Sequence, residues 1–253
     1  MSRSRLTVTP SASSAWLHTP RWPCEHASVS SADAPQTIPA ATVVLLRDDE
    51  GHLETLMLHR TSAVAFGGMW VFPGGKVDDG DRRPGDSDDE AAARRAAARE
   101  AAEECALLIE PHEVVPFSHW TPPPEAPRRY ATWFFVARAS DGDVLVDGGE
   151  IHDHAWLTPR EVLARRDRGE VDLAPPTYVT LADLAAFERV DDALLAAAER
   201  EPLPHYETRW AVTEDGAVAL WAGDAGYDTT NPGADGPRHR LWMRQTGWLL
   251  ERS

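Results

Sequence analysis

The sequence is poor in cysteine, in basic relative to acidic residues and in long apolar runs, and each scarcity narrows the classes of protein that it can encode. Only two of the 253 residues are cysteines, Cys24 and Cys105, so a disulfide framework is not expected and a reducing, cytoplasmic compartment is favoured. No stretch approaches the length of a transmembrane helix, so no membrane association is predicted. Lys and Arg number 25 against 41 Asp and Glu, a formal net charge of −16, so nucleic acid is not an expected partner. Lys76 is the single lysine, which says little about mechanism.

The chain divides by composition near residue 38. Residues 1–38 are rich in Ser, Thr, Pro and Ala and contain no apolar segment typical of a secretion signal, so we predict a disordered N-terminal tail. The remaining residues, 39–253, are long enough for one large domain with a C-terminal extension.

Apolar and β-branched stretches predict most of the regular structure of the chain. Strands are expected over 41–47, 53–60, 70–72, 114–120, 130–137, 203–212 and 217–221, and near 238–243. Thr158 is expected to cap a helix that begins at Pro159. Two further helices are expected after Pro175 and from Asp191 to Arg200. Taken alone, this pattern predicts a protein that contains both helices and strands.

The most informative stretch contains three carboxylates on a predicted helix. Glu100, Glu103 and Glu104 stand at positions i, i+3 and i+4, which places them on one helical face. Crowded carboxylates repel one another, and a divalent cation, which prefers oxygen ligands, is the obvious counter-charge. The alternative is a solvated acidic face on an Ala-rich helix. A turn at Gly74-Gly75 favours the metal site, because glycines let the backbone come close to carboxylates.

The ends and faces of this helix can also be predicted. Ser87, followed three residues later by Glu90, has the pattern of a capping box and predicts the start of the helix. Arg99 lies one turn before Glu103 and can form an ion pair with it. Small apolar side chains on the other face predict close packing against a sheet. These are Ala98, Ala101, Ala102, Cys105 and Leu108.

Gly75 and the run R-E-A-A-E-E over residues 99–104 resemble the Nudix box of the Nudix hydrolases, G-x5-E-x7-R-E-U-x-E-E-x-G-U, in which U is aliphatic. The chain departs from this pattern at three points. Asp81 stands at the first acidic position, and 17 residues instead of seven separate it from the arginine. The polar Arg82–Asp89 segment, expected to be a loop, accommodates the extra residues. Ala106 stands where the family has its last glycine.

The resemblance implies a Nudix-type α/β/α sandwich with a mixed sheet and a C-terminal helical extension. It further implies an enzyme, a pyrophosphatase acting on acid anhydrides, that cleaves the diphosphate linkage of a nucleoside diphosphate derivative. Mg²⁺ or Mn²⁺ is the implied cofactor, and a nucleotide-derived small molecule is the implied partner. The implied metal ligands within the box are the Gly75 carbonyl, Glu100, Glu103 and Glu104, and the three glutamates would also be catalytic. A carboxylate outside the box is implied as a further ligand, with Glu150 as the first candidate and Asp153 as the second. Arg99 is the residue implied to orient the carboxylates.

A second, partial resemblance concerns the substrate. His59-Arg60-Thr61-Ser62, ahead of the box, resembles the corresponding region of Nudix coenzyme A diphosphatases, and the long C-terminal half resembles that of acyl-coenzyme A diphosphatases. Arg60 is our candidate for binding phosphate or carboxylate through its planar guanidinium, although it could equally be a surface arginine at a strand end. Two alternatives stay open: an inactive Nudix module that binds a nucleotide-like ligand for regulation, and a structural protein. The oligomeric state is not predicted.

Overall fold

The computed structural model describes residues 36–61, 67–86, 88–146, 148–244 and 246–253. The N-terminal tail predicted over 1–38 therefore lies almost entirely outside the described residues, and its disorder stays a prediction. The extent of the domain predicted over 39–253 also stays a prediction. Within the described ranges, no helix is both long enough and apolar enough to cross a membrane.

Eight strands form the central sheet, and their bounds are β1 Ile38–Asp49, β2 His52–Arg60, β3 Trp70–Val71, β4 Gly74–Lys76, β5 Val115–Thr121, β6 Tyr130–Arg138, β7 Ile151–Leu157 and β8 His205–Glu207. The strand order is β3-β2-β1-β6-β5-β8, with β4 paired to β1 and β7 paired to β2. The β1–β6 and β5–β8 pairs are parallel, whereas the β1–β2 and β5–β6 pairs are antiparallel. The sheet is therefore mixed, as predicted.

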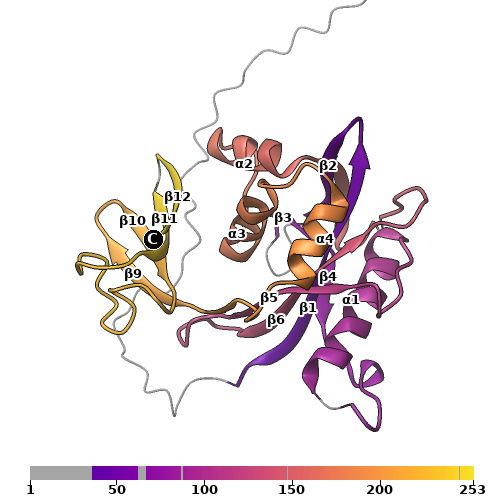
Figure 1. The fold of residues 1–253 in the computed structure, drawn as a ribbon, viewed down its shortest axis with the longest axis horizontal. Helices are drawn as coiled ribbons and strands as arrows, with labels where there is room; N and C mark the ends of the chain where they lie inside the picture. Colours follow the sequence, from indigo (N-terminus) through magenta and orange to yellow (C-terminus); the bar gives the residue numbers. More distant parts are fainter. Residues whose placement is uncertain (1–35, 62–66, 87, 147, 245) are drawn as a thin grey trace, which may run out of the picture.

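Helices cover both faces of this sheet (Figure 1). Along β1, Val43 and Leu45 face α1 (Asp89–Cys105), whereas Val44 and Leu46 face the opposite side. That opposite side is covered by α2 (Pro159–Asp167), α3 (Pro175–Leu184) and α4 (Val190–Ala198). A strand buried on both faces explains the continuous apolar run of β1. The predicted α/β/α sandwich is confirmed.

The C-terminal part adds a second, four-stranded antiparallel sheet to the two expected helices. Its strands are β9 Arg209–Thr213, β10 Gly216–Leu220, β11 His239–Arg244 and β12 Gly247–Arg252, in the order β12-β11-β10-β9. Figure 1 shows this sheet at the end of the molecule opposite α1. Strand β12 was not predicted from the sequence. The extension is therefore helical only through α4, and the chain beyond it is built mainly from strands.

Aromatic packing and one buried ion pair hold the second sheet. The Trp221 ring packs edge-on against Trp120 of β5 at a centroid distance of 5.6 Å. Arg240 contacts Asp224 at 2.6 Å, and both side chains are almost fully buried. Burial alone would raise the pKa of Asp224, but hydrogen bonds from the Arg240 side chain and from the His239 and Gly226 backbone hold it at about 2.

Helix α1 forms as predicted, but its two ends differ from the prediction. Asp88, and not Ser87, caps the helix by accepting a hydrogen bond from the Ala91 N–H at 3.2 Å; Ser87 itself lies outside the described residues. At the other end, Ala106 adopts a left-handed φ of 57° and stops the helix. Leu108 therefore lies beyond the helix and is 74% exposed, so its predicted packing against the sheet is wrong.

Candidate active site

Helix α1 presents the three predicted carboxylates to different environments. The Glu104 side chain is 8% exposed and the Glu100 side chain 14% exposed, whereas that of Glu103 is 59% exposed. Two of the three carboxylates thus face protein and one faces solvent. This arrangement differs from a uniformly solvated acidic face, because burying a charge without a counter-charge is costly.

Glu104 points toward the start of strand β4. Its Oε2 accepts a hydrogen bond of 2.9 Å from the Gly74 N–H, and its Oε1 lies 3.8 Å from Nη1 of Arg60. Burial raises the pKa of Glu104 to about 7, even though both of these contacts act in the opposite direction. The group is therefore a buried carboxylate with too little positive charge around it.

Glu100 packs directly against the glycine pair. A Cβ atom on Gly75 would lie 2.2 Å from Oε1 of Glu100, and one on Gly74 would lie 2.6 Å from the Ala41 carbonyl oxygen. The predicted turn at the two glycines is wrong, because both belong to strand β4. In the pairing of β4 with β1, Gly75 lies opposite Ala41. Their missing side chains allow the strand to fit between β1 and the carboxylates of α1. Burial also raises the pKa of Glu100, although Arg99 opposes this.

Arg99 organises the exposed side of the cluster. Its Nη1 donates to Oε1 of Glu100 and to Oε2 of Glu103, both at 2.9 Å, so the predicted pairing with Glu103 is confirmed. Its Nη2 donates to the Lys76 carbonyl at 2.9 Å and to Asp81 at 3.0 Å. The hydrogen bond to Asp81 is the main cause of a raised pKa at Arg99. The guanidinium stays charged and fixes two of the three glutamates.

Asp81 joins this network although 17 residues separate it from Arg99. It ends a short 3-10 helix, η1 (Asp79–Asp81), and it is buried. Its carboxylate receives two hydrogen bonds from Arg99, at 3.2 and 3.0 Å, and one of 2.9 Å from the Asp78 N–H. Asp81 departs from the family pattern in residue type, and no role in the site was predicted for it. The signal that could have identified it is the spacing of five residues between Gly75 and Asp81, which matches the family pattern.

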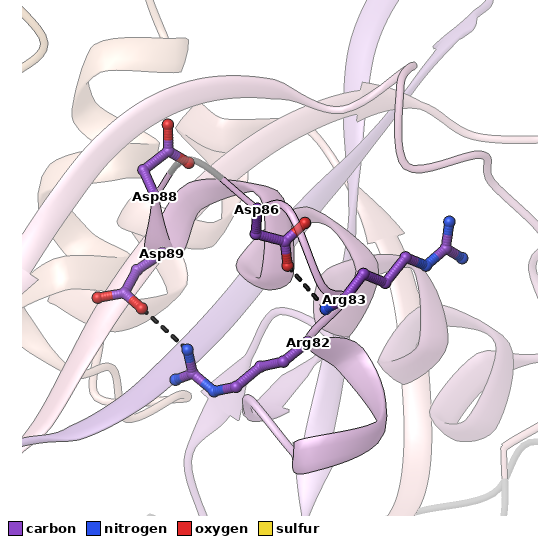
Figure 2. Close-up of a pocket in the computed structure, with 5 residues that line it drawn as sticks. All are labelled: Arg82, Arg83, Asp86, Asp88 and Asp89. Carbon is purple, nitrogen blue, oxygen red and sulfur yellow. Dashed lines mark hydrogen bonds and ion pairs between the residues drawn. The ribbon is translucent and has the colours of Figure 1, made fainter.

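Residues 82–86 lie in a loop, as predicted, but α1 already begins at Asp89, so part of the region between Asp81 and Arg99 is helical. The loop is held against α1. Arg95 donates to the Asp81 carbonyl at 2.5 Å and to the Asp86 carboxylate. A pocket lies at this loop and has a volume of about 390 Å³. Figure 2 shows the residues that line it: Arg82, Arg83, Asp86, Asp88 and Asp89. The pocket lies at the start of α1, roughly 16 Å along the helix from Glu100. That end of the pocket is therefore remote from Glu100, whereas Arg82 on its other side directly follows Asp81.

Arg60 and Glu150 reach the cluster from the ends of other strands. Arg60 ends β2, and its Nη2 donates to the Glu150 carboxylate just before β7, while its Nη1 faces Glu104. The structure thus brings together two predicted site residues that stand 90 positions apart. Asp153, the second candidate, accepts a hydrogen bond of 2.8 Å from the His154 N–H. Ser62, part of the second resemblance, lies outside the described residues.

Comparison with known proteins identifies the family. A model of the NUDIX domain matches residues 37–177, which is more than half of the chain. The chain belongs to the NUDIX family. Membership of this family supports the predicted hydrolase and is consistent with hydrolysis of the diphosphate in nucleoside diphosphate derivatives. It does not distinguish the coenzyme A diphosphatase subgroup from the rest of the family.

One solved structure shows the same fold at low sequence identity, and a second is similar to a lower degree. The Nudix hydrolase of Alicyclobacillus acidocaldarius is 24% identical, with a TM-score of 0.56, over 63% of this chain and 96% of that chain. The Nudix domain of Shewanella oneidensis NrtR, solved with ADP ribose, is 18% identical, with a TM-score of 0.46, over 63% of this chain and 92% of that chain. None of the curated proteins matches the chain.

The donor chemistry of the Nudix box fits a divalent cation. Its carboxylates are hard oxygen donors, and burial raises the pKa of both Glu100 and Glu104 although an arginine lies next to each of them. In the described part of the chain, however, no three His, Cys, Asp or Glu side chains already form a cluster that could hold a metal ion. Glu103 is turned toward Arg99 and Glu150 toward Arg60. A cation would therefore need these carboxylates to turn from their arginine partners.

Proposed function

We propose that the protein is a divalent-metal-dependent hydrolase that cleaves the diphosphate linkage of a nucleoside diphosphate derivative, with coenzyme A or an acyl-coenzyme A as the first candidate substrate. One observation carries this proposal: the carboxylates of Glu104, which is buried, and of Glu100, whose side chain is 14% exposed, converge on the Gly74-Gly75 strand. A solvated helical face would keep its carboxylates in water. The predicted cytoplasmic location belongs to this proposal.

In this proposal Glu100, Glu103 and Glu104 hold Mg²⁺ or Mn²⁺, and the Gly75 carbonyl and Glu150 complete the set of oxygen ligands. The bound cation would neutralise the negative charge of the diphosphate and acidify the attacking water. The oxygen of that water forms a bond to one phosphorus, the bridging P–O bond breaks, and the other phosphate leaves with the bridging oxygen. One of the carboxylates accepts the proton of the water.

The two arginines have separate roles. Arg99 orients Glu100 and Glu103, a role supported by its hydrogen bonds of 2.9 Å to both. Arg60 binds a phosphate or carboxylate of the substrate, because a planar guanidinium can donate two parallel hydrogen bonds to such a group. Its position next to Glu104 and Glu150 supports this role.

The choice of coenzyme A rests on the resemblance of residues 59–62 and on the size of the C-terminal part. A turnover assay with Mn²⁺ over coenzyme A, an acyl-coenzyme A, ADP-ribose, NADH and dinucleoside polyphosphates tests it. We expect cleavage of a coenzyme A species at its diphosphate. If the protein cleaves ADP-ribose but no coenzyme A species, the proposed substrate is wrong and the proposed reaction, hydrolysis of a diphosphate, is retained. Tight binding without any turnover would instead show an inactive, ligand-binding Nudix module.

A further inference from the structure

Arg60 is the one cationic side chain that contacts both Glu104 and Glu150 in the described part of the chain. Its side chain is 15% exposed, so most of the charge is removed from solvent. Only its contact with Glu150 is a hydrogen bond, since the 3.8 Å from Nη1 to Glu104 exceeds hydrogen-bond length. Its Nε is buried and has no partner among the described residues. The guanidinium is therefore held by charge, and its donors are incompletely used.

The backbone around Arg60 is fixed, which leaves the side chain as the part that can move. The Arg60 N–H donates to the Met69 carbonyl at 3.1 Å, and its carbonyl accepts from the Gly68 N–H at 3.0 Å. On the other side, the Thr61 N–H donates to the Glu150 carbonyl at 2.8 Å. The main chain next to Arg60 is thus tied to that of Glu150 through Thr61, so a rotation of the guanidinium would separate only the side chains.

We propose that Arg60 occupies the Glu104 and Glu150 carboxylates in place of the cation, and that cation binding displaces the guanidinium toward a phosphate of the substrate. The inference rests on the proposed function, because it concerns the same site. A single positive charge among several carboxylates is a weaker counter-charge than a divalent cation. Both cations use the same oxygens, so they compete. Arg60 should therefore weaken binding of the cation alone while strengthening binding of the diphosphate.

Opposite changes in two affinities distinguish this switch from a simple ligand or orienting residue. In Arg60→Met, we expect Mn²⁺ in the absence of substrate to bind about tenfold more tightly, because no guanidinium competes with it for the Glu104 and Glu150 oxygens. With Mn²⁺ saturating, we expect a methylene-bridged analogue of ADP to bind about tenfold more weakly. Free Mn²⁺ measured by electron paramagnetic resonance and analogue binding measured by calorimetry give these two values without any turnover.

The matched control is Arg47→Met. Arg47 contacts Glu54 at 2.7 Å in the β1–β2 pair, and its side chain is 40% exposed. The Arg47→Met substitution removes the same single positive charge from a chain of net charge −16. Its Mn²⁺ affinity therefore reports the general effect of net charge. We expect this affinity to stay within about twofold of the wild type, because exposed charges are screened by salt. Arg60→Gln carries the same expectation as Arg60→Met and replaces it if that variant does not fold.

Three results would overturn the inference. Mn²⁺ affinity in the folded Arg60 variants that is equal to that of Arg47→Met would show no local competition. Weaker Mn²⁺ binding would make Arg60 an orienting residue. Unchanged binding of the analogue would remove its role toward phosphate. A wild-type protein that binds no Mn²⁺ would overturn the proposed metal site itself, so failure of the inference and failure of the proposed function can be distinguished.

Discussion

Replacing Glu104 with glutamine removes a charge from the most buried of the three box glutamates while keeping its size and an oxygen for the Gly74 N–H. We expect Glu104→Gln to lose turnover and to be more stable than the wild type at pH 8 in a metal chelator. Both effects have one cause, because the charge that would hold the cation destabilises the protein when no cation is bound. A residue with a purely structural role would lose stability when changed.

The size of the stability change follows from the pKa of Glu104, which is about 7 in the folded protein against an ordinary value of 4.5. At a pH between 4.5 and 7, Glu104 is therefore largely protonated in the folded protein and largely ionised in the unfolded chain. The stability that this group contributes is therefore complete below pH 4.5 and is lost as the pH rises through 7. The interval from 4.5 to 7 corresponds to about 3 kcal/mol, since one pKa unit is worth about 1.4 kcal/mol. We expect glutamine to recover about 1–3 kcal/mol of this at pH 8 and less than about 1 kcal/mol at pH 5.

Urea unfolding in chelator at pH 5 and pH 8, together with turnover at limiting Mn²⁺, measures both effects. Glu103→Gln is the matched control, because its side chain is 59% exposed and its ion pair with Arg99 is worth about 0–1 kcal/mol. We expect both variants to lose turnover by roughly 10²–10⁴-fold, but only Glu104→Gln to gain stability as the pH rises. A Glu104→Gln variant that is less stable than the wild type at pH 8 would refute this reasoning, as would one that keeps wild-type turnover.

Two further predictions concern the backbone at each end of the box. In Gly75→Ala the new Cβ would lie 2.2 Å from Oε1 of Glu100, so we expect Glu100 to move and turnover to fall by roughly 100-fold. The control Gly80→Ala meets no atom within 4 Å and should stay within about twofold of the wild type; equal turnover of the two variants would contradict the prediction. Ala106→Gly should stabilise the protein by about 0.5–1 kcal/mol in urea unfolding, because φ is 57° at this residue; no gain would show that the left-handed turn costs nothing.

Local rules predicted the body of α1 but not its ends. The i, i+4 pair of Arg99 and Glu103 and the shared face of the glutamates follow from helical spacing, which tertiary contacts do not alter. Ser87 and Asp88 are both good N-cap residues, so the sequence could not decide between them. The helix stops at Ala106 although alanine favours helices, and Leu108 is therefore exposed.

Long-range contacts account for what the sequence could not predict in the site. Gly74-Gly75 was expected to be a turn because glycine pairs usually mark one, but its pairing with β1 makes it a strand. The contact of Arg60 with Glu150 depends on the β2–β7 pairing, which no local pattern encodes. Asp81 reaches Arg99 only because the inserted loop folds back along α1. In each case the residue type was visible in the sequence and its partner was not.

Hydrolysis of a nucleoside diphosphate derivative by the wild-type protein, with and without a divalent cation, tests the proposed function most directly. The substrate and its products would be followed by phosphorus NMR, first in excess chelator and then after addition of Mg²⁺ or Mn²⁺. The proposal predicts no detectable cleavage in chelator and cleavage of the diphosphate once the cation is restored. Full turnover in metal-free buffer would contradict the role assigned to Glu100, Glu103 and Glu104.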